Sequence, residues 1–119
     1  MTTRETIERY FDTLSRRGAL DALLADDVVF ERLTNPPNRV EGRSAFLAAT
    51  GRFYGSVATF DVRDVVVDDD RASTLTRYAV RTPTASEPFE SYVAEFFVVR
   101  DGAIVKLSIC FDMTPYPKT

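Results

Sequence analysis

The sequence predicts a single α+β domain, because helical and extended patterns occupy different halves of the chain. Apolar residues recur at helical spacing near the N-terminus and again after Gly42, whereas from Phe60 onward they alternate along four successive segments. Helices followed by consecutive strands favour an antiparallel meander packed on the helices. With 119 residues, 45% of them hydrophobic, the chain is long enough for one core, so we expect one domain over residues 1–119.

The first half of the chain contains three predicted helices and one short strand. Thr2 and Glu5 form a capping-box pattern ahead of the first helix, and Gly18 ends it. The third helix, of about three turns, begins after Gly42. The first two helices and the strand are expected at residues 3–17, 20–27 and 28–33.

The second half contains four predicted strands joined by short connections. Three consecutive aspartates, at 68–70, and the pair Asp101-Gly102 are typical of hairpin turns. Residues 113–119 contain two prolines and are expected to form a loose tail. The strands are expected at residues 60–67, 71–81, 89–100 and 103–112.

The charge of the chain argues against two classes of partner. The formal net charge is −3, and the basic residues are scattered along the sequence. Nucleic acids and anionic membranes select clustered positive charge, so we expect neither as a partner. The N-terminal residues lack the apolar segment of a signal peptide, and we expect a cytoplasmic location.

The absence of histidine narrows the chemistry further. With no His in the chain, the usual Ser-His-Asp and Cys-His arrangements and the imidazole metal sites are excluded. No phosphate-binding loop, dinucleotide fingerprint or calcium loop is present, so we expect no cofactor and no metal. Acid–base chemistry is left to carboxyl groups and tyrosines.

Glu95 is the main candidate for an acid–base residue. It lies in the middle of a strand that otherwise reads as buried, on the same face as Val93 and Phe97. Burial of an unpaired charge costs several kcal/mol, so a carboxylate at this position is paired, protonated or functional. Asp64 interrupts the apolar face of an earlier strand and marks either a bulge or a second acid in a pocket.

The opposite face of the same strand is also apolar. Tyr92, Phe96 and Val98 alternate with the residues of the Glu95 face, and one layer of helices covers only one side of a sheet. We expect a homodimer through this outer face. The alternative is that a bulge or the C-terminal tail covers it.

These features together resemble the nuclear transport factor 2-like superfamily, which includes the ketosteroid isomerases and the SnoaL-like polyketide cyclases. The resemblance is carried by residues 7–11, 23–30, 41–46 and 96–105. It implies a strongly curved antiparallel sheet wrapped around the N-terminal helices, a cystatin-like cone with an internal pocket for a small organic molecule, in a homodimer. For an enzyme it implies isomerase, cyclase or hydrolase chemistry without a cofactor.

The isomerase comparison assigns roles to three positions. Tyr10 matches the tyrosine that stabilises the oxyanion, and Glu95 matches an aspartic acid that is held protonated. At the position of the general base this chain has Arg32, which cannot accept a proton at ordinary pH. Steroid-type isomerisation is therefore not expected.

An arginine offers a second interpretation of Glu95. Alignment of the aspartate turn with its family counterpart places Leu75 and Arg77 on the inner face, where an Arg77–Glu95 pair would lower the carboxyl pKa. Tyr10 as partner would favour a neutral Glu95, whereas Arg77 would favour the anion. The residues expected to line the pocket are Phe30, Arg32, Leu75, Arg77, Val93, Phe97 and Phe111.

Three functions are consistent with these residues. The first is an enzyme that acts on a compact apolar carbonyl compound, with Glu95 and Tyr10 as the catalytic residues. The second is a non-catalytic protein that binds a small organic anion through Arg32 and Arg77. The third is a dimerisation module whose cone is filled by side chains.

Overall fold

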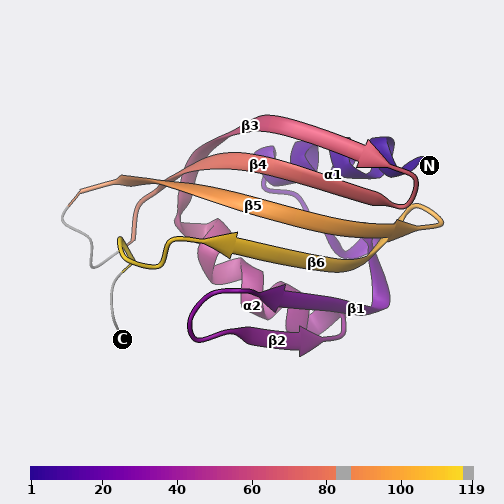
Figure 1. Cartoon of the computed structure of the whole chain (residues 1–119), viewed down its shortest axis with the longest axis horizontal. Helices are drawn as coiled ribbons and strands as arrows, with labels where there is room; N and C mark the ends of the chain where they lie inside the picture. Colours follow the sequence, from indigo (N-terminus) through magenta and orange to yellow (C-terminus); the bar gives the residue numbers. More distant parts are fainter. Residues whose placement is uncertain (83–86, 117–119) are drawn as a thin grey trace.

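The part of the chain that the structure describes forms two helices and six strands, with one short 3₁₀ helix between the two helices (Figure 1). The structure is a computed structural model that describes residues 1–82 and 87–116. The elements in chain order are α1 (Thr3–Ser15), η1 (Asp21–Leu23), β1 (Leu24–Arg32), β2 (Asn38–Glu41), α2 (Arg43–Ser56), β3 (Val57–Asp68), β4 (Arg71–Val80), β5 (Phe89–Arg100) and β6 (Ala103–Phe111). The predicted α+β class is confirmed.

The strands form one mixed sheet in the order β2-β1-β6-β5-β4-β3. The predicted antiparallel meander is present in β3 to β6, but β1 runs parallel to β6, so the sheet is not purely antiparallel. Strand β2 was not expected, because its four residues are mostly polar and carry little alternation. Strand β1 begins at Leu24, where the sequence predicted the second helix to continue.

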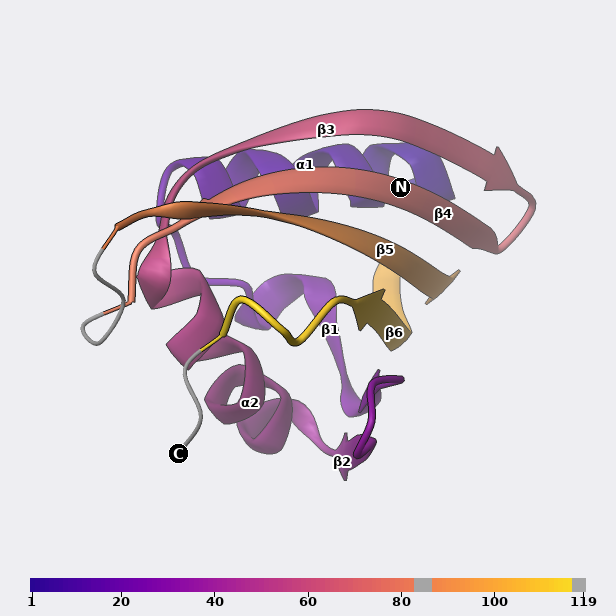
Figure 2. The same ribbon diagram turned by 60° about the vertical axis from the view of Figure 1, so that its left-hand side comes forward.

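The sheet is curved and the two helices lie on its concave side, under different parts of it (Figure 2). Helix α1 contacts β3, β4 and β5, whereas α2 contacts β1 and β2. Ile7, Tyr10 and Phe11 are the buried apolar residues of α1, and the Tyr10 and Phe97 rings meet edge to face at 5.4 Å. The sheet does not close into a barrel, and a core of buried side chains packs between it and the helices.

Local capping explains where α1 begins and ends. The Glu5 amide donates to Thr2 Oγ1 at 3.1 Å and the Thr2 amide donates to Glu5 Oε1 at 3.0 Å, as the capping-box pattern predicts. The helix ends at Ser15, earlier than expected, because Arg17 has a left-handed φ of 53°. The Gly18 amide then donates to the Thr13 carbonyl at 2.9 Å.

Two local features are a bulge within β3 and the packing of the segment after β6. The register of β3 against β4 shifts between Val62 and Asp64, so Asp64 marks a bulge and is exposed rather than a pocket acid. Beyond β6, within the predicted tail, Tyr116 packs its ring against Phe111 at 5.3 Å and Phe89 at 5.0 Å. The last three residues of the predicted tail lie outside the described residues.

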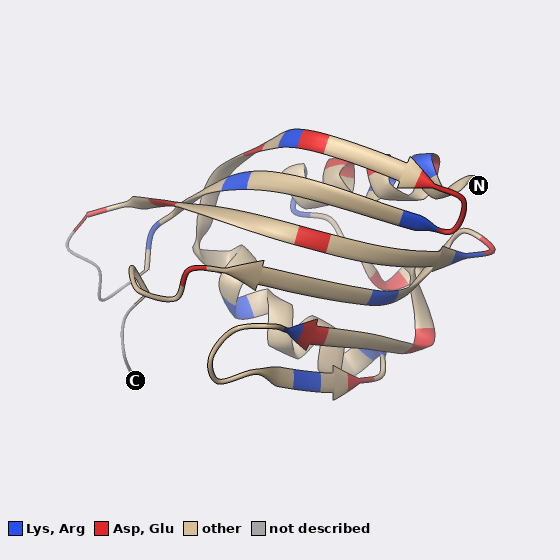
Figure 3. Ribbon diagram, viewed as in Figure 1, with Lys and Arg blue, Asp and Glu red and all other residues tan. Residues whose placement is uncertain are grey.

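Acidic and basic residues are interspersed along the strands and helices (Figure 3). Within residues 1–82 and 87–116, no helix is both long and apolar enough to cross a membrane.

Candidate functional site

Glu95 lies near the middle of β5 and points to the concave side of the sheet. Only 1% of the residue is exposed, and its direct cross-strand neighbour is Thr74 of β4. Because residues two apart on a strand share a face, Thr74, Thr76 and Tyr78 all point toward the same side as Glu95. The predicted burial of Glu95 is confirmed.

Three hydroxyl groups donate hydrogen bonds to the Glu95 carboxyl group. Oε1 accepts from Thr74 Oγ1 at 2.7 Å and from Thr76 Oγ1 at 2.6 Å, and Oε2 accepts from the Tyr78 hydroxyl at 2.6 Å. Hydroxyl groups donate or accept according to how they rotate. The cluster therefore satisfies Glu95 as a carboxylate and adapts when the group takes up a proton.

The environment of Glu95 favours its neutral form. Burial raises the pKa of the Glu95 carboxyl group, and the hydrogen bonds from Thr76, Tyr78 and Thr74 offset part of that rise without reversing it. The three donors are neutral, so they stabilise the negative charge less than a guanidinium does. A carboxyl group with a raised pKa holds its proton more tightly and is a stronger base once it has lost it.

Two further tyrosines, Tyr10 and Tyr54, lie near Glu95 in the core. The hydroxyl groups of Tyr10 and Tyr54 are 2.5 Å apart and share a hydrogen bond. Burial raises the pKa of Tyr54, and the neighbouring hydroxyl groups of Tyr10 and Tyr78 partly counter that rise. Tyr10 therefore contacts Tyr54 and is not among the three hydroxyl groups that donate to Glu95. Burial raises the pKa of Tyr10 and Tyr78 as well, so all three phenols are protonated at neutral pH.

A cavity of about 120 Å³ lies between α2 and the sheet, and Glu95 forms part of its wall. Three acid–base or charged groups line it: Glu95, Tyr54 and Arg32, whose Nε donates to Thr34 Oγ1 at 3.0 Å. The remaining lining residues are Phe30, Asn38, Ala49, Thr50, Phe53, Val93, Ile109 and Phe111. Of the residues predicted to line a pocket, Phe30, Arg32, Val93 and Phe111 do so.

The other predicted lining residues lie elsewhere. Arg77 is on the convex face, where its Nη1 is 2.7 Å from Glu90 Oε1, so the expected Arg77–Glu95 pair is wrong. Leu75 is on the same face and 40% exposed. The prediction failed because the inward-facing residues of β4 were assigned by counting alternate residues from the aspartate turn. The observed pairing of Thr74 with Glu95 places the other set of alternate residues on the inner face. Phe97 is on the expected face but packs under α1 instead of lining the cavity.

Sequence reasoning missed Tyr54 and the three hydroxyl donors of β4. A signal for the donors was present, since Thr74, Thr76 and Tyr78 alternate in the strand just before that of Glu95. It identifies partners only once the pairing of β4 with β5 is known. No group of three or more His, Cys, Asp or Glu side chains in the described part of the chain is placed to hold a metal ion.

Comparisons with known proteins agree with this architecture. The sequence profile of the SnoaL-like domain matches residues 7–107. A search of curated proteins found no match.

Several solved structures share the fold over nearly the whole chain. An NTF2-like protein of unknown function from Mesorhizobium loti is 25% identical, with a TM-score of 0.76 over 92% of this chain and 90% of that one. A Kribbella flavida protein provisionally named a ketosteroid isomerase is 24% identical. Its TM-score is 0.77, over 98% of this chain and 82% of that one. An LEH-like epoxide hydrolase from M. tuberculosis is 22% identical. Its TM-score is 0.76, over 95% of this chain and 84% of that one. The profile match spans most of the 119 residues, and the chain therefore belongs to the SnoaL-like domain family of the NTF2-like superfamily.

Proposed function

We propose that the protein is an enzyme that transfers a proton on a small, largely apolar carbonyl compound bound in the cavity between α2 and the sheet. The observation that carries the proposal is the carboxyl group of Glu95, which is 1% exposed and forms part of the cavity wall. Within residues 1–82 and 87–116 its hydrogen-bond donors are three neutral hydroxyl groups. A buried carboxyl group with a raised pKa is characteristic of acid–base sites.

The size of the cavity limits the substrate. An engineered protein cavity of about 150 Å³ binds benzene, so a cavity of about 120 Å³ suits a molecule of one ring or less. Its aromatic and aliphatic walls favour an apolar body, while Glu95, Tyr54 and Arg32 offer polar contacts to an oxygen atom.

The chemistry divides between Glu95 and the tyrosines. As a carboxylate, Glu95 removes a proton from the carbon next to the carbonyl group, and the electron pair moves onto the carbonyl oxygen to form an enolate. The Tyr54 hydroxyl group, which is hydrogen-bonded to that of Tyr10, donates a hydrogen bond to the enolate oxygen. Glu95 then returns the proton to carbon. In this scheme Tyr10 positions Tyr54 and does not touch the substrate.

Deuterium exchange tests this proposal without a known substrate. We expect the protein in D₂O to speed the exchange of the α-protons of cyclopentanone, followed by ¹H NMR, because the proposed base removes just these protons. Glu95→Gln should abolish the acceleration. The matched control is Glu90→Gln, an exposed residue of the same strand, which should exchange at the wild-type rate. Equal rates for the wild-type protein and Glu95→Gln would contradict the assignment.

Arg32 favours a second candidate function, the binding of a small organic anion without catalysis. It lies on the cavity wall, and a guanidinium group binds carboxylates in a bidentate manner. Of the two arginines predicted to bind an anion, only Arg32 lines the cavity, because Arg77 lies on the other face of the sheet. For this candidate we expect benzoate to raise the melting temperature of the wild-type protein and not of Arg32→Gln, with no exchange activity in either.

A further inference from the structure

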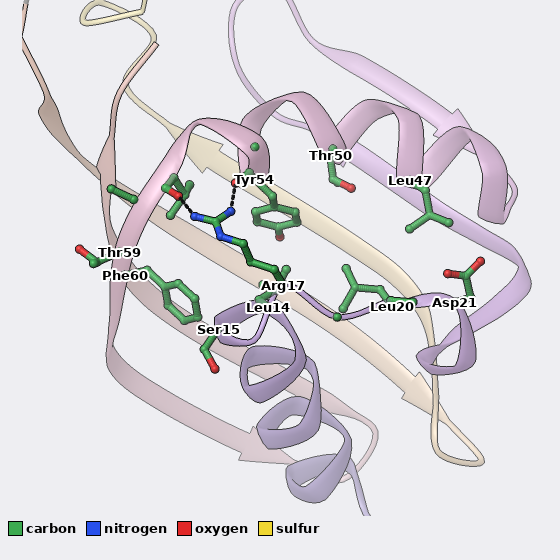
Figure 4. A pocket seen from close by; sticks show the side chains of 16 residues that line it. Leu14, Ser15, Arg17, Leu20, Asp21, Leu47, Thr50, Tyr54, Thr59 and Phe60 are labelled. Carbon is green, nitrogen blue, oxygen red and sulfur yellow. Dashed lines mark hydrogen bonds between the residues drawn. The ribbon is translucent and has the colours of Figure 1, made fainter. Parts of the chain in front are cut away.

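A second and larger cavity, of about 490 Å³, also has Tyr54 in its wall (Figure 4). It is bounded by the end of α1, the segment that leads to η1, the second half of α2 and the start of β3. It shares Thr50 and Tyr54 with the cavity at Glu95, but Glu95 and its three hydroxyl donors do not line it. This volume is within the range of ligand sites, which runs from about 300 to 1,000 Å³.

The walls of this cavity are mainly apolar. Its polar lining residues include Ser15, Arg17, Asp21 and Thr59, several of which Figure 4 shows around the space. The large apolar side chains are Leu14, Leu20, Leu47, Val57 and Phe60, together with the Tyr54 ring. Such a lining favours an aliphatic or aromatic body.

Two glycines of α2, Gly51 and Gly55, leave the space open on the helix side. They lie one turn apart on α2 and both line the cavity. Glycine is the poorest helix former after proline, yet neither residue has a positive φ, and a Cβ added at either would meet no atom within 4 Å. Neither the backbone nor the packing requires glycine here. What these residues provide is room in the cavity.

The charged groups of this cavity favour a neutral ligand. Arg17 donates from Nη2 to the Val57 carbonyl at 2.6 Å and from Nη1 to the Tyr54 carbonyl at 3.5 Å. Its charge therefore faces the C-terminal carbonyl groups of α2, which carry partial negative charge. A bound anion would approach the same oxygens, and the second charged group of the lining, Asp21, is itself acidic.

We propose that this cavity is a second binding site, for a neutral molecule built of two or three apolar rings, and that it binds its ligand independently of Glu95. Tyr54 lines both this cavity and the site proposed for proton transfer, whereas Glu95 lines only the latter. The two proposals fail separately, because their linings have only Thr50 and Tyr54 in common.

A fluorescent probe tests this site directly. The chain has no tryptophan, so the emission of 1-anilinonaphthalene, excited beyond the tyrosine absorption, reports on the probe alone. We expect saturable binding of one probe per chain. Gly51→Leu or Gly55→Leu should weaken it at least about tenfold with an unchanged or raised melting temperature, since leucine fills the cavity and favours the helix.

Three comparisons complete the experiment. Ala48→Leu, at an exposed position of α2 that lines neither cavity, should bind the probe as the wild-type protein does, and so should Glu95→Gln. The 8-sulfonate of the same probe should bind at least about tenfold more weakly, because it adds a negative charge next to Asp21 and the carbonyl groups that Arg17 contacts. The proposal is overturned if no saturable binding occurs, if both folded leucine variants keep their affinity, if Ala48→Leu loses as much, or if the sulfonate binds as tightly. Loss of binding in Glu95→Gln would also overturn the independence of the two sites.

Discussion

At the scale of single residues, Glu95 is stabilised by neutral hydroxyl groups and not by an opposite charge. Alternation along β5 was sufficient to predict that this carboxyl group is buried. Its partners Thr74, Thr76 and Tyr78 belong to another strand, and no local pattern states which residues of that strand face it. Tyr10 was predicted as the phenol that contacts the substrate, but Tyr54, to which its hydroxyl group is hydrogen-bonded, is the tyrosine that lines the cavity.

Removal of one hydroxyl group from this cluster should be measurable in both stability and titration. Tyr78→Phe leaves Glu95 Oε2 without its donor, so we expect a loss of about 1–3 kcal/mol in the free energy of unfolding. The pKa of Glu95 should rise further, because the Tyr78 hydrogen bond lowers it. Urea unfolding and ¹³C NMR measure the two effects. Tyr92→Phe, at a tyrosine that is 51% exposed, is the control and should change neither. A fall in the Glu95 pKa in Tyr78→Phe would contradict this account.

At the scale of elements, local periodicity was enough for most helices and strands but not for their pairing. Helix α1 and strands β3 to β6 were predicted within a few residues, because their apolar spacing is a local property. The parallel pairing of β1 with β6 joins segments more than 70 residues apart, and no short-range signal encodes it. The face of β4 was assigned wrongly because a shift of one residue reverses every side chain of a strand.

Adjacent residues of β4 offer a test of its observed register. Thr76 is fully buried and donates to Glu95, whereas Arg77 is paired with Glu90 on the convex face. Thr76→Val should therefore lower the free energy of unfolding by about 1–3 kcal/mol, and Arg77→Gln by less than about 1 kcal/mol. Denaturant unfolding of both variants measures the difference. A larger loss for Arg77→Gln would mean that Arg77 lies on the buried face.

At the scale of the whole molecule, the convex face of the sheet remains uncovered in the described structure. Tyr92 and Phe96 of β5 are 51% and 47% exposed, Leu75 of β4 is 40% exposed, and Val98 is half-buried beside them. Both helices lie on the opposite, concave side (Figure 2). We propose that a second copy of the chain covers this face, since a homodimer would remove these side chains from water.

Sedimentation velocity tests the proposed dimer. The wild-type protein should sediment as a dimer, and Phe96→Glu as a folded monomer, because a charge would be buried in the interface. Ala48→Glu, on the exposed side of α2, is the control and should remain dimeric. A monomeric wild-type protein at all concentrations, or a dimeric Phe96→Glu, would exclude this interface.

Titration of the Glu95 side chain, followed by ¹³C NMR, distinguishes a carboxyl group held by neutral hydroxyl groups from one paired with a cation. Glu95→Gln assigns the carboxyl signal. Because burial outweighs three neutral hydrogen bonds, we predict a midpoint above the ordinary value of 4.5. In Arg77→Gln the midpoint should not move, since Arg77 lies on the other face of the sheet. A midpoint at or below 4.5, as expected for a carboxylate paired with an arginine, would contradict the account.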